Sequence, residues 1–146
     1  WDDRLKLQSQ FSLEEKGWQV PVEWKMTQYG IGLFAAEDID GDTVLRQGIV
    51  GDNLVKFEST EDVEDFVGDD APRLRYVSDY LWGLYLDTDE RGDPISTEKQ
   101  FYGMWVPGNG LNHNPDANSV YRATTKGVDL IALGSISKGD EIYDDY

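Results

Sequence analysis

The sequence contains no cysteine and a single histidine, and these absences exclude several classes of protein. A disulfide scaffold and a thiolate zinc cluster both require cysteine. One histidine also argues against a histidine-based catalytic triad or a multi-histidine metal site. No apolar run approaches the roughly 18 residues that a membrane-spanning helix needs. We therefore expect a folded protein without a metal centre, located inside the cell in the cytoplasm or nucleus.

Basic residues are also scarce. The chain has 13 Lys and Arg against 29 Asp and Glu, which gives a formal net charge of −16. Such a surface would repel phosphate backbones and anionic lipid, so we expect neither a nucleic-acid nor a membrane partner. A lysine-rich peptide would instead be attracted and steered. The simpler interpretation, that the charge mainly maintains solubility, stays open.

What the sequence does contain is enough apolar material for one globular domain over residues 1–146. Apolar residues make up 39% of the chain and aromatic residues 12%, which is typical of a folded domain with its own core. Short apolar runs alternate with Gly, Asp and Asn turn signals, and this favours a mainly β fold. The pattern predicts strands over residues 32–36, 43–50, 80–86, 120–124, 128–133 and 141–143.

A single helix is predicted over residues 59–67. Ser59 or Thr60 can cap its first turn, and the acidic residues Glu61, Asp62 and Glu64 suit a helix N-terminus. The segment 112–118 (NHNPDAN) is rich in Asn and Pro. We expect no regular element there.

Three motifs follow one another in a meaningful order. They are YGIGLFA at residues 29–35, NHNPDAN at 112–118 and GDEIYDDY at 139–146. Together they resemble the SET-domain family of protein lysine methyltransferases. The resemblance covers about residues 25–146, with core motifs over 25–50 and 103–146 and a variable insert over about 51–102. Asn114, Pro115 and Ala117 depart from the usual family residues.

The resemblance implies a SET-domain β-clip fold. Its parts would be small curled sheets, a C-terminal segment threaded through a loop as a pseudoknot, and a short helical insert. The chain would be a compact single-domain member without cysteine-rich segments before or after the SET motifs. If the sequence is complete, a partner or another element would have to close the lysine channel.

The family's cofactor is S-adenosylmethionine, and the resemblance assigns it to two motifs. Backbone groups around Gly30 and Gly32 would hold its methionine end, because glycine lets the main chain approach a ligand closely. The cofactor-binding residues implied are Tyr29, Gly30, Ile31, Gly32, Asn112 and His113. His113 would act mainly through its backbone.

The resemblance also implies a lysine channel for a lysine-containing, basic protein or peptide substrate. Tyr146 would orient the amine, and Tyr121 would be a second catalytic residue lining the channel. Tyr102, Trp105 and Asp144 are further channel candidates. Trp82 and Tyr85 are also candidates for the cofactor or lysine pocket, and core packing is the favoured alternative for all four aromatic residues.

Asp144 stands at a position that governs the number of methyl groups added in this family. An acid there would stabilise the protonated, unreactive amine. Either Asp144 points away from the channel or the site is unusually tuned.

Two other functions compete with methyl transfer. The first is a SET-fold module without catalysis that binds basic peptides through its acidic surface. The second is a calcium site, because Asp87, Asp89 and Glu98 imitate an EF-hand loop. Arg91 occupies a ligand position of that loop, so an acidic turn is the better interpretation. The sequence leaves the substrate protein and the oligomeric state open.

Overall fold

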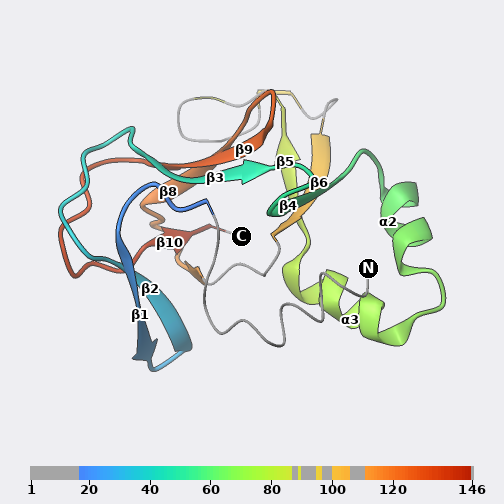
Figure 1. The fold of residues 1–146 in the computed structure, drawn as a ribbon, viewed down its shortest axis with the longest axis horizontal. Coiled ribbons are helices and arrows are strands. Elements are labelled where there is room, and N and C mark those ends of the chain that lie inside the picture. Colours follow the sequence, from blue (N-terminus) through green and yellow to red (C-terminus); the bar gives the residue numbers. More distant parts are fainter. Residues whose placement is uncertain (1–16, 87–88, 90–94, 97–99, 106–110, 146) are drawn as a thin grey trace.

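The structure is a computed structural model that describes residues 17–86, 89, 95–96, 100–105 and 111–145. Among the described residues, small β-sheets are the main regular structure, and helices project at one end, as Figure 1 shows. The predicted mainly β class is therefore confirmed. In the described part of the chain, no helix is long and apolar enough to cross a membrane.

The first sheet is a hairpin of β1 (Val22–Thr27) and β2 (Gly30–Ala35). The strands pair antiparallel along their full length, from Val22 opposite Ala35 to Thr27 opposite Gly30. Gly30 has a φ of 111°, a conformation that glycine adopts without steric cost. The Thr27 hydroxyl donates a 2.8 Å hydrogen bond to the Gly30 carbonyl and closes the turn.

A second sheet has the antiparallel order β3-β9-β8. It consists of β3 (Val44–Ile49), β8 (Ser119–Ala123) and β9 (Gly127–Ala132). The central strand β9 buries nearly all of its side chains, as expected for a strand covered on both faces. Predicted strands at 32–36, 43–50, 120–124 and 128–133 correspond to β2, β3, β8 and β9 with slightly shifted bounds.

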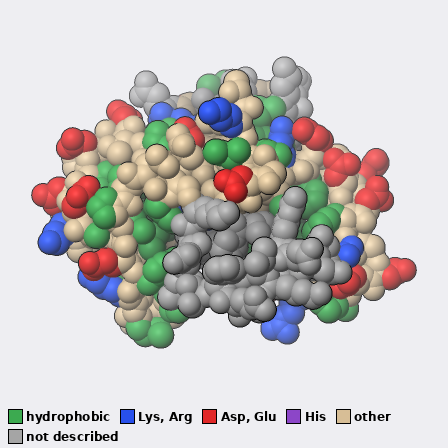
Figure 2. All heavy atoms as spheres, viewed as in Figure 1, with side chains coloured by type: hydrophobic (Ala, Val, Ile, Leu, Met, Phe, Trp, Pro, Cys, Tyr) green, Lys and Arg blue, Asp and Glu red, His purple; other side chains and the backbone are tan. Residues whose placement is uncertain are grey.

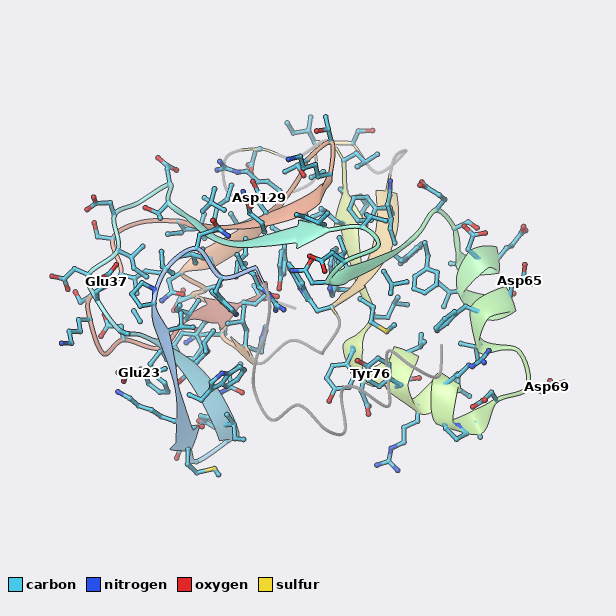
Figure 3. All side chains as sticks on the ribbon, viewed as in Figure 1. Glu23, Glu37, Asp65, Asp69, Tyr76 and Asp129 are labelled. Carbon is cyan, nitrogen blue, oxygen red and sulfur yellow. The ribbon has the colours of Figure 1, made fainter. Side chains whose placement is uncertain are left out.

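The third sheet contains much of the insert. It has the order β4-β6-β5, with β4 (Leu54–Phe57), β5 (Trp82–Tyr85) and β6 (Gln100–Trp105) all antiparallel. The helices α2 (Thr60–Val67) and α3 (Ala71–Tyr80) lie beside it. Phe57, Val67, Val77 and Met104 form the core between helices and sheet, and Tyr76 packs against it from α3 (Figure 3).

Three sequence predictions for the local structure are wrong. The insert holds two helices and not one, because Asp70 caps α3 by accepting a 2.9 Å hydrogen bond from the Arg73 backbone N–H. Tyr80 ends this helix and does not begin a strand. Asn112 and His113 form a short strand, β7, in a segment expected to be irregular.

The C-terminal segment is threaded between two parts of the chain. On one side, the Ile142 N–H donates to the Leu33 carbonyl of β2 at 2.8 Å. On the other side, β10 (Tyr143–Asp144) pairs in parallel with β7 (Asn112–His113). These contacts join the glycine-rich hairpin, the Asn-rich loop and the chain end in one place.

Candidate active site

The three sequence motifs meet at the Asn112 side chain. Its amide nitrogen donates a 2.6 Å hydrogen bond to a Glu141 carboxylate oxygen and lies 3.5 Å from the Ile31 carbonyl. Both partners accept hydrogen bonds, so they hold the NH₂ end of the amide. The Asn112 amide is thereby oriented with its NH₂ group towards Glu141 and the backbone of β2.

Gly32 makes this arrangement possible. A Cβ at this position would overlap the Glu141 carboxylate and lie 3.1 Å from the Asn112 amide nitrogen. Because Gly32 lacks a side chain, the carboxylate can approach the backbone of β2. The Tyr143 hydroxyl also bonds to Glu141, and this bond raises the pKa of the tyrosine.

Strand β10 is held by side chains of the preceding loop. Asn118 accepts a 2.9 Å bond from the Tyr143 backbone N–H and donates a 2.8 Å bond to the Glu141 carbonyl. The Ser119 hydroxyl donates a 2.5 Å bond to the Tyr143 carbonyl. Three hydrogen bonds therefore set the position of a two-residue strand that could not hold its place alone.

Successive side chains of a strand point to opposite faces, and β10 separates two environments in this way. Tyr143 lies with Glu141 and the glycine-rich strand. Asp144 lies on the other side, where it is buried and hydrogen-bonded to the Tyr121 hydroxyl. This second side opens into a cavity of about 550 Å³.

The cavity lies between β5 and the loop that precedes β8. Gly83 and Tyr85 contribute from β5, Asp116 from the loop, and Tyr121 and Asp144 from the strands behind it. Burial raises the pKa of the Asp144 carboxyl to about 6, and the bond from Tyr121 is one of the contacts that oppose this rise. The cavity thus has a carboxyl group that is ionised near neutral pH but weakly hydrated.

Aromatic side chains hold Tyr121 in place. Its ring stacks on Trp82 with centroids 5.2 Å apart and an interplanar angle of 3°. The Trp105 indole N–H donates a 3.2 Å bond to the Tyr121 hydroxyl oxygen. Trp105 itself is fully buried, and the Arg46 guanidinium lies 3.9 Å from its ring centroid.

The structure brings most of the predicted site residues into two groups. Gly30, Ile31, Gly32 and Asn112 lie at the first, with Tyr29 exposed at the hairpin turn beside them. His113 is exposed, and its Nδ1 lies 3.6 Å from an Asp145 carboxylate oxygen.

The second group is Tyr121 and Asp144 at the cavity. Trp105 supports Tyr121 from the core, and Tyr102 packs against the core beneath the insert helices. Neither of these two is among the residues found to line the cavity. Asp144 is among the residues that line the cavity, and its role in a lysine channel stays a prediction.

Tyr146 lies outside the described residues, so its catalytic role stays a prediction. Asp87, Arg91 and Glu98 of the calcium-like loop also lie outside them. In the described part of the chain, no three acidic or histidine side chains converge as a metal site would require.

Sequence reasoning gave no role to two residues that organise the site. Glu141 orients Asn112, and Asn118 fixes the strand that carries Asp144. Both belong to the matched motifs, so their positions were a usable signal. Trp82, a pocket candidate with core packing as its alternative, stacks on Tyr121, and Tyr85 lines the cavity.

Comparisons with known proteins identify the family of this chain. The SET-domain family model matches residues 30–146, so the chain belongs to the SET-domain family of protein lysine methyltransferases. No curated protein matches the sequence significantly.

Three solved structures share the fold. A candidate histone methyltransferase of Plasmodium falciparum has a TM-score of 0.53 and 18% identity, over 88% of this chain and 94% of the other. DIM-5, a SET-domain histone lysine methyltransferase of Neurospora, has a TM-score of 0.58 and 21% identity, over 90% of this chain and 54% of the other. CpSET8 of Cryptosporidium has a TM-score of 0.57 and 14% identity, over 86% of this chain and 56% of the other.

At these identities the likeness shows the fold alone. The chain spans a little over half the length of the Neurospora and Cryptosporidium chains.

Proposed function

We propose that this protein is a protein-lysine N-methyltransferase that uses S-adenosylmethionine and acts on a lysine of a basic protein or peptide. The observation that carries the proposal is the position of β10 in a chain of the SET-domain family. The strand has the Asn112–Glu141 group on one side and the Tyr121–Asp144 cavity on the other. The methyl donor would bind on one side of β10 and the amine on the other, and transfer would take place where the two sites adjoin.

The first group suits the methionine end of the cofactor. The Asn112 amide oxygen, the Ile31 carbonyl and the Glu141 carboxylate are acceptors that match an ammonium group. Gly30 and Gly32 leave the backbone open to close approach. When bound, S-adenosylmethionine supplies a methyl group activated by a sulfonium ion.

The second group would receive the lysine side chain. Tyr121 and Asp144 would orient the amine, and Tyr146 would hold it in line with the methyl group. Positioning of this kind can contribute several kcal/mol to lowering the barrier. The acidic surface supports a basic substrate, since Figure 2 shows acidic side chains on both sides of the visible face.

Cofactor binding tests the first half of the proposal. Calorimetric titration with S-adenosylmethionine should show binding, and Gly32→Ala should weaken it at least about tenfold, because the new Cβ displaces Glu141 and Asn112. Gly134→Ala is the matched control, since a Cβ there meets nothing within 4 Å. A folded wild-type protein that binds no cofactor at millimolar concentration would contradict the proposal.

Methyl transfer tests the second half. Lysine-containing peptides on an array, incubated with labelled cofactor, should acquire label from the wild-type protein. Tyr146→Phe should reduce the rate by on the order of 100-fold or more. Tyr80→Phe, at an exposed tyrosine of α3, should retain it. Peptide binding that persists without cofactor or transfer would instead favour a binding module.

A further inference from the structure

The groups around Asn112 suit only one of the two charges at the methionine end of S-adenosylmethionine. This end carries both an ammonium and a carboxylate at neutral pH. The Glu141 carboxylate and the Ile31 carbonyl are acceptors, so they can bind the ammonium and would repel the carboxylate. We propose that Lys25 of β1 binds the carboxylate. The inference rests on the proposed function, because it takes S-adenosylmethionine to be the ligand of the glycine-rich hairpin.

The strand register places Lys25 on the face of the hairpin that carries these groups. Lys25 lies directly opposite Gly32 in the antiparallel pair of β1 and β2. Side chains opposite each other in such a pair point to the same face, with their Cβ atoms about 5 Å apart. A Cβ at Gly32 would overlap the Glu141 carboxylate and approach the Asn112 amide. Lys25 therefore shares a face of the hairpin with both.

The same face leaves backbone open to a ligand. Gly30 and Gly32 both belong to it, because they are two residues apart in β2. Among the described residues, no atom lies within 4 Å of a Cβ built at Gly30. Glu141 pairs with Phe34 along the edge of β2 that is not paired with β1. The face thus has a lysine on one side, a carboxylate on the other and glycine backbone between them.

Lys25 is the cation that this part of the fold supplies. It is the only lysine or arginine on the four strands β1, β2, β7 and β10 that build the site. Its ammonium lies 3.7 Å from a Glu23 carboxylate oxygen and 5.0 Å from the Phe34 ring centroid. Both side chains of this ion pair are about half exposed, and exposed pairs contribute little to stability. A ligand carboxylate can therefore replace Glu23 as the partner of Lys25 at small cost.

Decarboxylated S-adenosylmethionine is the probe that isolates this contact. It retains the amine and the sulfonium and lacks only the carboxylate, so it keeps the ammonium contacts and loses the contact with Lys25. Calorimetric titration of the folded protein with each ligand at about pH 7, where the carboxylate is ionised, gives two dissociation constants. Their ratio measures recognition of the carboxylate and does not depend on methyl transfer.

The wild-type protein should bind S-adenosylmethionine on the order of tenfold more tightly than the decarboxylated ligand. Lys25→Met keeps an unbranched stem without the charge and should remove most of this preference by weakening S-adenosylmethionine alone. Lys25→Gln should have the same effect and provides a second variant if the first does not fold. Lys25→Arg retains a cation at the same place and should retain most of the preference.

Lys56 offers a matched control. Its ammonium lies 3.0 Å from a Glu58 carboxylate oxygen and 4.8 Å from the Phe101 ring centroid, much as Lys25 lies beside Glu23 and a phenylalanine ring. It belongs to β4, in a different sheet away from the hairpin (Figure 1). Lys56→Met removes the same charge from the protein and should leave the ratio of dissociation constants unchanged.

The inference is wrong if both uncharged Lys25 variants keep the wild-type ratio, or if they weaken the two ligands equally. Equal affinities of the wild-type protein for the two ligands, or a change of the ratio by Lys56→Met that matches the change by Lys25→Met, would also overturn it. In these cases the protein still binds S-adenosylmethionine, so the proposed function stands. If the wild-type protein binds neither ligand at millimolar concentration, the proposed function fails and the inference fails with it.

Discussion

The Asp144 carboxyl is buried, and burial disfavours its ionised form. Its pKa is raised from 3.8 to about 6, chiefly by burial. The folded protein therefore binds this proton more tightly than the unfolded chain does, and stability is lost as the pH rises from about 4 to about 6. Above this range the ionised group costs up to about 3 kcal/mol, at 1.36 kcal/mol per pKa unit.

Replacing Asp144 with asparagine should remove this cost. We expect Asp144→Asn to raise the free energy of unfolding by up to about 3 kcal/mol at about pH 8 and to change it little below about pH 4. Asparagine still accepts a bond from Tyr121. Urea unfolding at several pH values measures the difference. Asp140→Asn, an exposed carboxylate on the same segment, should show no such dependence. If Asp144→Asn changed the free energy of unfolding equally at about pH 8 and below about pH 4, burial of the ionised carboxylate would not be the cause.

Among single residues, those of the motifs could be predicted from the sequence, but the residues that they contact could not. Asn112 and the glycines of β2 were identified from motif order, because close backbone approach and amide recognition need those residue types. The stacking of Trp82 on Tyr121 depends on residues 39 positions apart in the sequence. No local pattern encodes a contact over such a separation.

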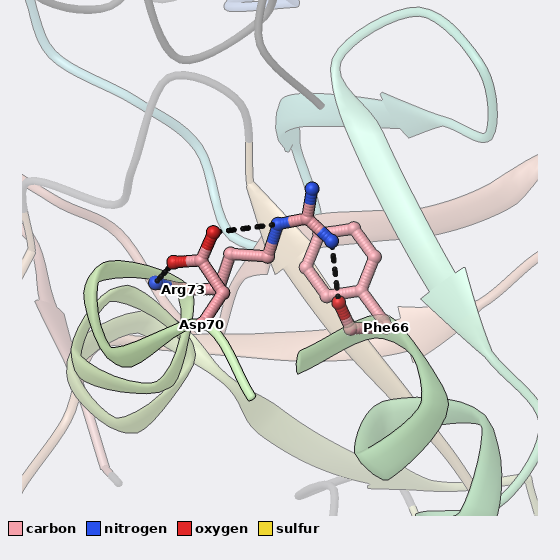
Figure 4. A network of polar contacts seen from close by, with 3 residues as sticks. All are labelled: Phe66, Asp70 and Arg73. Carbon is pink, nitrogen blue, oxygen red and sulfur yellow. Dashed lines mark hydrogen bonds and ion pairs between the residues drawn. The ribbon is translucent and has the colours of Figure 1, made fainter. Parts of the chain in front are cut away.

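Helix α3 shows how one capping residue organises an element. Asp70 accepts a 2.9 Å bond from the Arg73 backbone N–H, and its other carboxylate oxygen lies 3.6 Å from the Arg73 Nε. The Arg73 guanidinium also donates a 3.1 Å bond to the Phe66 carbonyl of α2 (Figure 4). The pair thus starts α3 and ties it to α2.

We expect Asp70→Ala to lower the free energy of unfolding by about 1–2 kcal/mol, because the helix loses its cap and Arg73 loses its partner. Asp69→Ala removes a neighbouring exposed acid that does not cap the helix. Its effect should stay within about 0.5 kcal/mol. Urea unfolding of both variants decides the matter, and equal losses would show that the cap is unimportant.

The elements also show which patterns can be read from a sequence. The cap at Ser59 and the acidic first turn correctly predicted α2. Asp70 followed by Pro72 is a similar signal, but α3 has only Val77 fully buried, so its apolar pattern is weak. The strands β7 and β10 have two residues each. A segment that short has no periodicity, and it forms only because distant strands pair.

On the scale of the whole molecule, the negative charge is spread widely. Glu23 and Glu37 point outward at one end, and Asp65 and Asp69 at the other (Figure 3). With a formal net charge of −16, the protein should attract a basic substrate from a distance before specific contacts form. Salt screens such exposed charges strongly, so the steering should depend on ionic strength.

Changing the ionic strength tests the steering. The screening length shortens from about 30 Å at 10 mM salt to about 3 Å at 1 M. We expect the association rate of a lysine-rich peptide to fall by on the order of tenfold or more over this range, while its dissociation rate changes much less. Stopped-flow fluorescence with a labelled peptide measures both rates.

The control is a peptide with the same central lysine and neutral flanking residues. Its association rate should depend only weakly on salt, because one charge is steered less than several. If the association rates of both peptides fell equally with salt, the attraction would not come from the charge of the flanking residues, and the steering would be disproved.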